Sequence, residues 1–248
     1  MPRGGNGGGG GGGKPGGGDD GTITGTKNDD VLIGTDGDDI FNPGLGNDQI
    51  FGEEGSDTVT YAWIINSSFG IVADLEADSE FGTVTYNQFK GKNSGPFTDK
   101  LYSIENIVGS QFGDDIFGDD GNNTLDGQGG RDILDGRGGD DILIGGESDD
   151  RLNGGAGDDT LTGDTLTSGG GGVDVFIFEG AFGNDTITDF EDGIDLLDFS
   201  GIDLSIDNLT ISASASGSDT VIEDGLGNSI TLTGIDSGLI TADDFFFG

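Results

Sequence analysis

The chain has 248 residues, of which 54 are glycine, and its 9 Lys+Arg against 48 Asp+Glu give a net charge of −39. So negative a chain repels phosphate backbones and anionic lipid, which argues against nucleic-acid binding and membrane insertion. Cysteine and histidine are both absent, which excludes disulfides, zinc sites built on these ligands, and catalysis by a thiolate or an imidazole.

The first segment, residues 4–18, is almost wholly glycine. Polyglycine has a high backbone entropy and no side chains to bury, so it does not order by itself. We therefore expect residues 1–21 to form a flexible glycine-rich tail. The alternative is a tail that neighbouring chains hold in an assembly.

A nine-residue repeat begins at Gly25. Four copies run without a gap over 25–60, six more run over 109–162, and two separate copies occupy 169–177 and 180–188. Glycine stands first in nearly every copy, glycine or a small residue usually fourth, Asp sixth, and a large aliphatic residue or Phe eighth. A period of this length indicates a solenoid.

Each position of the repeat has a physical task. The glycines permit a tight turn whose carbonyls point inward. The eighth residue lies in a three-residue strand, so it alone faces the interior. Two copies then make one coil, the strands stack in parallel about 4.8 Å apart, and the turns line both edges.

The copies resemble the repeats-in-toxin (RTX) nonapeptide, Gly-Gly-x-Gly-x-Asp followed by x, a large apolar residue and x. The resemblance implies an all-β fold, a right-handed parallel β-roll or β-solenoid, with calcium held between turns by sixth-position carboxylates and turn carbonyls. The composition agrees, because 39 of the acidic residues are Asp, the shorter acid that suits turns and hard cations. The implied calcium ligands are Asp30, Asp39, Asp48, Asp57, Asp114, Asn123, Asp132, Asp141, Asp150, Asp159, Asp174 and Asp185.

The resemblance also implies which of these residues share a calcium ion. The implied pairs are Asp30 with Asp48, Asp39 with Asp57, Asp114 with Asp132, Asp132 with Asp150, and Asp141 with both Asn123 and Asp159. Asp174 follows a six-residue break, 163–168, so the sequence assigns it no partner. Sites that use Asn123 or Asp114 are expected to be weaker, because Asn123 is neutral and Phe112 replaces a glycine beside Asp114.

A different interpretation makes these Asp residues a solvated acidic surface, since Asp-Gly pairs are common in turns. Stacked coils, however, bring the carboxylates of neighbouring turns close together, and without a counterion their repulsion opposes the stacking. We therefore expect calcium to be required for folding.

Residues 61–108 lose the nine-residue period but keep strand-like pieces. We expect an irregular continuation of the solenoid with a looped-out segment over 90–97. Tyr61, Trp63 and Phe69 could form a sugar-binding platform, but a role in capping a thin core is favoured.

The end of the chain is similar to the carboxy-terminal cap of secreted RTX proteins, on the segments 182–190 and 193–200. Short antiparallel strands over 220–222 and 230–232 are expected to cover the last coil and block further strand pairing. Residues 243–247 resemble the acidic-then-apolar tail that type I secretion machinery reads. The amino terminus lacks the apolar segment of a secretory signal, so export in one step is expected.

The expected domains are a tail (1–21), a first β-roll block (22–60), the insert (61–108), a second block (109–188), and a cap with the secretion signal (189–248).

The resulting functional hypothesis is a secreted calcium-binding protein, extracellular or at the cell surface, with a structural role. Its uncovered first coil and glycine tail favour a homo-oligomer or filament. The alternative is an export or folding module related to RTX polysaccharide-modifying enzymes, of the alginate lyase or epimerase type, without the catalytic domain. No intrinsic enzymatic activity is expected. The nine-residue repeat accounts for nearly every pair of Asp residues that could act as acid and base, and histidine is missing. A third interpretation, a flat ligand-binding face of Thr-x-Thr strands, would need stacked threonines that adjacent coils do not supply.

Overall fold

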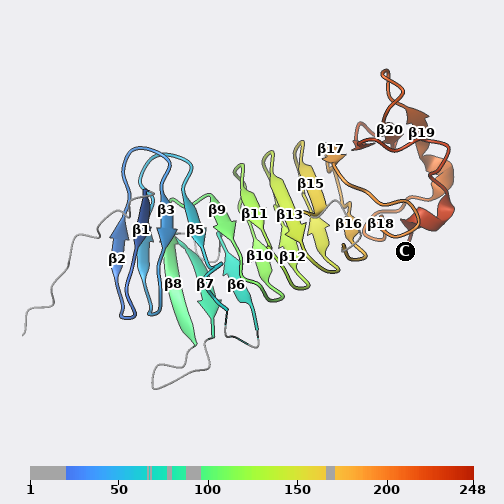
Figure 1. The fold of residues 1–248 in the computed structure, drawn as a ribbon. Helices are drawn as coiled ribbons and strands as arrows, with labels where there is room; N and C mark the ends of the chain where they lie inside the picture. The colour runs from blue at the N-terminus through green and yellow to red at the C-terminus, as the bar shows by residue number, and fades with distance from the viewer. Residues whose placement is uncertain (1–20, 66, 68, 77–79, 88–95, 166–170) are drawn as a thin grey trace, which may run out of the picture.

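The computed structural model describes residues 21–65, 67, 69–76, 80–87, 96–165 and 171–248, so the glycine tract lies outside the described residues. Its strands form two sheets of 11 strands each. Figure 1 shows the coils stacked along one direction, from β1 and β2 in blue to β15 and β16 in yellow, with the cap beyond them in orange and red. No helix in the described part of the chain is long and apolar enough to span a membrane.

Both sheets are built mainly from strands of three to five residues. The first sheet has the order β1 (Thr22–Thr24), β3 (Ile40–Asn42), β5 (Thr58–Thr60), β9 (Asn106–Val108), β11 (Thr124–Asp126), β13 (Ile142–Gly146), β15 (Thr160–Asp164), β17 (Asn184–Ile187), β21 (Ser229–Leu232), β20 (Thr220–Glu223) and β19 (Thr210–Ala213). The second has the order β2 (Val31–Ile33), β4 (Gln49–Phe51), β8 (Phe97–Tyr102), β7 (Gly82–Tyr86), β6 (Ile71–Asp74), β10 (Asp115–Phe117), β12 (Ile133–Asp135), β14 (Arg151–Asn153), β16 (Val175–Ile177), β18 (Leu196–Asp198) and β22 (Phe245–Phe246). Two 3-10 helices, Ile206–Asn208 and Ala242–Asp244, lie in the cap.

The repeat copies form the predicted parallel β-roll. Consecutive copies alternate between the two sheets, and partners in one sheet lie two copies apart, as Leu125 lies opposite Leu143 and Leu134 opposite Leu152. The eighth residue of every copy is buried, with at most 1% of its surface exposed: Leu32, Phe41, Ile50, Val59, Ile116, Leu125, Leu134, Leu143, Leu152, Leu161, Phe176 and Ile187. The core therefore consists of two facing rows of apolar side chains between the sheets.

The insert differs from a simple continuation of the solenoid. Strands β6, β7 and β8 pair antiparallel with one another inside the second sheet, while β8 and β6 pair parallel with β4 and β10. The first sheet meanwhile passes directly from β5 to β9 and then to β11. Strands β7 and β8 have five and six residues, and the insert lacks the nine-residue pattern that sets the turns elsewhere. Most of the expected loop over 90–97 lies outside the described residues, and Phe97 is the first residue of β8.

The predicted antiparallel cap is confirmed. Strands β19, β20 and β21 form an antiparallel meander, and β21 joins it to the last coil by pairing parallel with β17. The segment expected to act as a secretion signal is folded into this cap, because β22 pairs with β18 and the Phe245 ring lies 6.0 Å from that of Phe199.

Candidate metal centre

The sixth-position side chains form ladders along both edges of the roll, each interrupted at the insert. In each ladder a carboxylate accepts a hydrogen bond from the backbone amide of the sixth residue one coil earlier. The amide-to-carboxylate distances are 2.7 Å for Asp30 to Asp48, 2.8 Å for Asp39 to Asp57, 2.7 Å for Asp114 to Asp132, 2.7 Å for Asn123 to Asp141, 2.8 Å for Asp132 to Asp150, 2.8 Å for Asp141 to Asp159, 2.8 Å for Asp150 to Asp174, and 3.0 Å for Asp159 to Asp185. Every pair that the resemblance implied is thus brought together, and Asp174 lies between Asp150 and Asp195.

One oxygen of most of these carboxylates has no hydrogen-bond partner. The Oδ2 atoms that are buried and without a hydrogen bond belong to Asp48, Asp57, Asp132, Asp141, Asp150, Asp159 and Asp174. All seven residues are at most 1% exposed. A buried carboxylate oxygen without a partner is costly, so these atoms require a proton or a cation.

First-position glycines hold open the space into which the oxygens of Asp57, Asp132, Asp141, Asp150 and Asp159 point, and Gly163 does so for Asp174. A Cβ added at Gly127 would meet Asp132 Oδ2 and, at 2.7 Å, the carbonyl oxygen of Gly145 in the next coil. Gly136 is arranged in the same way toward Asp141 Oδ2 and the Gly154 carbonyl. Carboxylate and backbone carbonyl oxygens are the donors that calcium prefers. Within the described residues no three acidic side chains converge on a common metal position, so a cation bound here would need backbone carbonyls as well as carboxylates.

The first coil of each repeat block is different, because a hydroxyl residue replaces the second glycine in three of the four copies concerned. Thr26, Thr35 and Ser110 each donate a backbone amide to the Oδ2 atom of Asp30, Asp39 and Asp114, at 2.6 Å in all three cases. Asn123, which replaces Asp, accepts the amide of Asp119 through Oδ1 at 2.8 Å. These four positions therefore offer a cation less than the seven with an unpartnered oxygen.

The electrostatics of the ladders favour a bound cation or a proton. Burial, with neighbouring carboxylates adding to it, raises the pKa of Asp132 and Asp150 to about 8. Burial likewise raises the pKa of Asp141 and Asp174 to about 7. Hydrogen bonds from the preceding amides oppose these increases without cancelling them.

Three acidic residues outside the nonapeptide copies complete the ladders, and the sequence interpretation missed them. Asp99 accepts the amide of Asp48 at 2.9 Å, Glu105 accepts that of Asp57 at 2.8 Å, and Asp195 accepts that of Asp174 at 3.0 Å. Each of them stands two residues before a buried aliphatic side chain, Leu101, Ile107 and Leu197 respectively. That Asp/Glu-x-aliphatic spacing is the part of the repeat that survives without its glycines, and it could have identified them.

Near Asp48 and Asp99, two tyrosine hydroxyls donate hydrogen bonds to a carboxylate oxygen and to turn carbonyl oxygens. Tyr61 donates its hydroxyl to Asp99 Oδ2 at 2.8 Å. The Tyr86 hydroxyl lies 2.9 Å from the Gly44 carbonyl oxygen and 3.2 Å from that of Gly46, two turn carbonyls of the third copy. Both rings are buried. Their hydroxyl groups therefore give hydrogen bonds to buried oxygens here, whereas the buried Oδ2 atoms of the repeats have no such donor.

Replacing Tyr86 by Phe is therefore expected to destabilise the calcium-saturated protein by about 1 to 3 kcal/mol, because buried carbonyls lose their donor. Added calcium should not restore the loss. Thermal unfolding at saturating calcium measures it, with Tyr102→Phe as the matched control, since the Tyr102 ring stacks on Phe51 at the half-buried outer face. Equal unfolding temperatures for the two variants would show that the hydrogen bonds of the Tyr86 hydroxyl do not stabilise the fold.

The other aromatic residues of the insert divide between core and surface. Tyr61 is fully buried, and Trp63 packs against the core, which confirms the core interpretation for both. Phe69 is 64% exposed. Threonines of β15 and β17 lie side by side, with the hydroxyls of Thr162 and Thr188 2.8 Å apart. The strands β9, β11 and β13 separate β15 from β5, so among the described strands the threonines do not run the length of the sheet.

Comparison with known proteins identifies the repeats. The family model of the RTX calcium-binding nonapeptide repeat (four copies) matches residues 15–50, 44–61, 108–143 and 135–165. The chain is similar to the extracellular lipase LipA of Serratia marcescens, with 19% identity and a TM-score of 0.38, over 90% of this chain and 39% of the lipase. It is also similar to the R3 and R2 subunits of the mannuronan C5-epimerase AlgE6 of Azotobacter vinelandii. The R3 subunit is 30% identical with a TM-score of 0.29, over 56% of this chain and 80% of the subunit, and the R2 subunit is 28% identical with a TM-score of 0.30, over 58% and 92%. No curated protein matches the chain.

Proposed function

Because this chain carries RTX calcium-binding nonapeptide repeats, we propose that it is a secreted β-roll protein that folds on calcium outside the cell and has a structural, self-assembling role there. The observation that carries the calcium-dependent part is the set of seven buried, unpartnered Oδ2 atoms, of which those of Asp57, Asp132, Asp141 and Asp150 lie beside a backbone carbonyl. Calcium would supply the positive charge that these oxygens need, and the ligands would be Asp48, Asp57, Asp132, Asp141, Asp150, Asp159 and Asp174.

The magnitudes support a folding switch. Extracellular calcium sites typically bind at about 10⁻⁴ to 10⁻³ M, and at millimolar calcium each site contributes about 1 kcal/mol. Several such sites together approach the total stability of an ordinary domain, about 5 to 15 kcal/mol. In calcium-poor cytosol the same carboxylates repel one another, so the chain stays unfolded and suited to export.

Self-assembly is supported by the amino-terminal end of the roll. Strand β2 has one neighbour, β4, in the second sheet, and its residues Val31 and Ile33 are 51% and 54% exposed. An apolar end strand with one paired side is a template for a strand of another molecule. The occupant we propose is the opposite end of a second copy of this chain, where strands β19 and β22 also have one neighbour each. Repeated from head to tail, this contact builds a fibre.

The experiment has two stages. Far-UV circular dichroism should show β-sheet with millimolar calcium and an unfolded spectrum with chelator, and an unchanged spectrum would refute the switch. Negative-stain microscopy at millimolar calcium should then show fibres or sheets. The double variant Val31→Lys, Ile33→Lys should abolish them, whereas Ile142→Lys, an exposed position on the central strand β13, should not. Uniform monomers of the unaltered protein would refute assembly but leave the switch intact.

A further inference from the structure

Resting on the proposed calcium-dependent function, we propose that residues of the insert complete the divalent-cation site of Asp57, at the junction of the first repeat block and the insert. Its ligands are the Asp57 carboxylate, the Ser103 carbonyl and the Glu105 carboxylate. Ser103 and Glu105 belong to no nonapeptide copy, so the site is built half from the repeat and half from the insert.

Asp57 presents its unpartnered oxygen toward the insert. Its Oδ1 atom accepts the Asp39 amide at 2.8 Å, while Oδ2 is buried without a partner. A Cβ added at Gly52 would meet both Asp57 Oδ2 and the Ser103 carbonyl oxygen. These two oxygens therefore converge beside Gly52, as Asp132 Oδ2 and a glycine carbonyl converge beside Gly127 in the repeats.

Ser103 and Glu105 take the places of repeat residues. The Gly52 amide donates to the Tyr102 carbonyl at 2.9 Å, so Ser103, the next residue, stands where a copy would have its first glycine. Glu105 stands where the copy would have its Asp, and its Oε2 atom accepts the Asp57 amide at 2.8 Å. The short segment 103–105 thus reproduces the carbonyl and the carboxylate of a copy without its six-residue turn.

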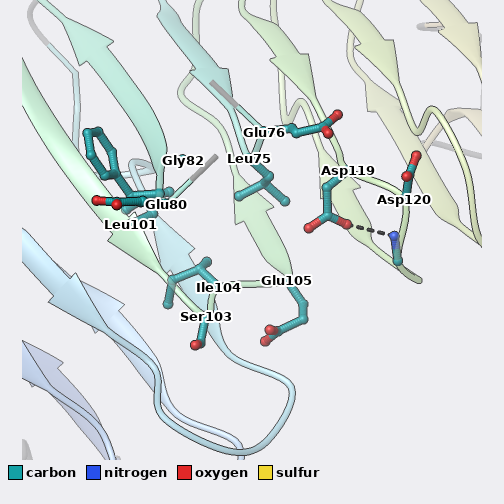
Figure 2. Close-up of a pocket in the computed structure, with 12 residues that line it drawn as sticks. Leu75, Glu76, Glu80, Gly82, Leu101, Ser103, Ile104, Glu105, Asp119 and Asp120 are labelled. Atoms are coloured by element: carbon teal, nitrogen blue, oxygen red, sulfur yellow. Dashed lines mark hydrogen bonds between the residues drawn. The ribbon is translucent and has the colours of Figure 1, made fainter. Parts of the chain in front are cut away.

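The missing turn leaves this site beside a cavity of about 620 Å³, which Ser103 and Glu105 help to line. The cavity lies where the second sheet holds the extra strands β6 and β7 while the first sheet has none. Figure 2 shows Ser103 and Glu105 on one side of it and Glu76, Asp119 and Asp120 on another. Acidic walls around a recess concentrate cations, so we expect this site to exchange its ion with solvent faster than the repeat sites.

The test counts bound calcium ions per full-length chain by native mass spectrometry, backed by equilibrium dialysis. Glu105→Gln keeps the acceptor for the Asp57 amide but removes the charge, and it should bind one ion fewer than the unaltered protein. Glu54→Gln removes the same charge from an exposed residue of the Asp57 turn and should keep the full count. Glu105→Asp retains the carboxylate, and should keep the ion with lowered affinity.

Asp132→Asn separates this inference from the proposed function, because it removes a ligand inside the repeats. Loss of an ion in Asp132→Asn together with an unchanged count in Glu105→Gln would overturn the junction site alone. An unaltered protein that binds no calcium would overturn the proposed function itself. If Glu105→Gln fails to fold, the count in Glu105→Asp decides: an affinity equal to that of the unaltered protein at every site would also refute the assignment.

Discussion

In calcium-free solution, lowering the pH from about 8 to about 5 is expected to increase the β-sheet content of the chain. The folded state holds several carboxylates whose pKa burial raises, to about 8 at Asp132 and Asp150 and to about 7 at Asp141. In the unfolded chain the pKa of an Asp is about 3.9. A group whose pKa is higher in the folded state stabilises that state below the unfolded pKa, and this contribution is lost as the pH rises through the folded pKa. The metal-free roll therefore loses stability between about pH 4 and pH 8.

The size of the effect is large enough to decide folding. One pKa unit corresponds to about 1.4 kcal/mol, and an increase of even one or two units at several sites is comparable to the whole stability of a domain, about 5 to 15 kcal/mol. With calcium the dependence reverses, because calcium binds ionised carboxylates and protons compete with it. Acid should thus fold the calcium-free chain and weaken calcium binding in the holo form.

Far-UV circular dichroism of calcium-depleted protein across this range measures the effect, at low concentration because the isoelectric point of about 4.1 limits solubility below the range. Asp132→Asn combined with Asp150→Asn replaces two protonated acids by neutral amides, and should shift the folding transition to higher pH. The control pair Asp36→Asn and Asp192→Asn removes the same charge from exposed positions and should shift it much less. A sheet content that falls as the calcium-free protein is acidified would contradict the account.

The nine-residue pattern was sufficient to predict the two-sheet roll, its parallel register and its core. Each copy carries its own instructions: glycines for the turn, and one apolar residue flanked by polar neighbours for the strand. Leu143 and Leu161 could therefore be placed in the same interior row without any knowledge of the rest of the chain, and both are fully buried. The resemblance to the RTX repeat implied the partners of the sixth-position residues.

The insert could not be predicted in the same way, because its pairing is not local. Asp99 contacts the amide of Asp48, 51 residues earlier, and the two meet because β8 pairs with β4 after the chain has passed through β6 and β7. The sequence also could not show which oxygen of a carboxylate is satisfied. Asp39 and Asp57 occupy the same position of the repeat. The Thr35 amide nevertheless donates to Oδ2 of Asp39, whereas Oδ2 of Asp57 has no partner.

Replacing Gly136 by Ala is expected to destabilise the calcium-bound protein by about 3 kcal/mol or more, a large effect for one methyl group. The new Cβ would lie 2.5 Å from the Gly154 carbonyl oxygen and would also meet Asp141 Oδ2. Because a backbone carbonyl of the neighbouring coil cannot rotate away, the two coils must separate. The methyl group would also displace the oxygens that we propose to bind calcium. Each 1 kcal/mol lowers the melting temperature of a chain this long by about 2 to 4 °C, so a decrease of roughly 6 to 12 °C or more should appear in calorimetry at saturating calcium.

The matched control is Gly37→Ala, also within a repeat. A Cβ at Gly37 meets no atom within 4 Å, and Gly37 does not have the positive φ that disfavours other residues. Restricting the unfolded chain should make this substitution neutral or stabilising by up to about 1 kcal/mol. The contrast between the two glycines isolates the space beside the carboxylate from backbone flexibility, because both substitutions add the same methyl group to the same motif. If the two variants melt at the same temperature and need the same calcium concentration to fold, this expectation is wrong. The close approach of Asp141 Oδ2 and the Gly154 carbonyl beside Gly136 would then not be needed for stability.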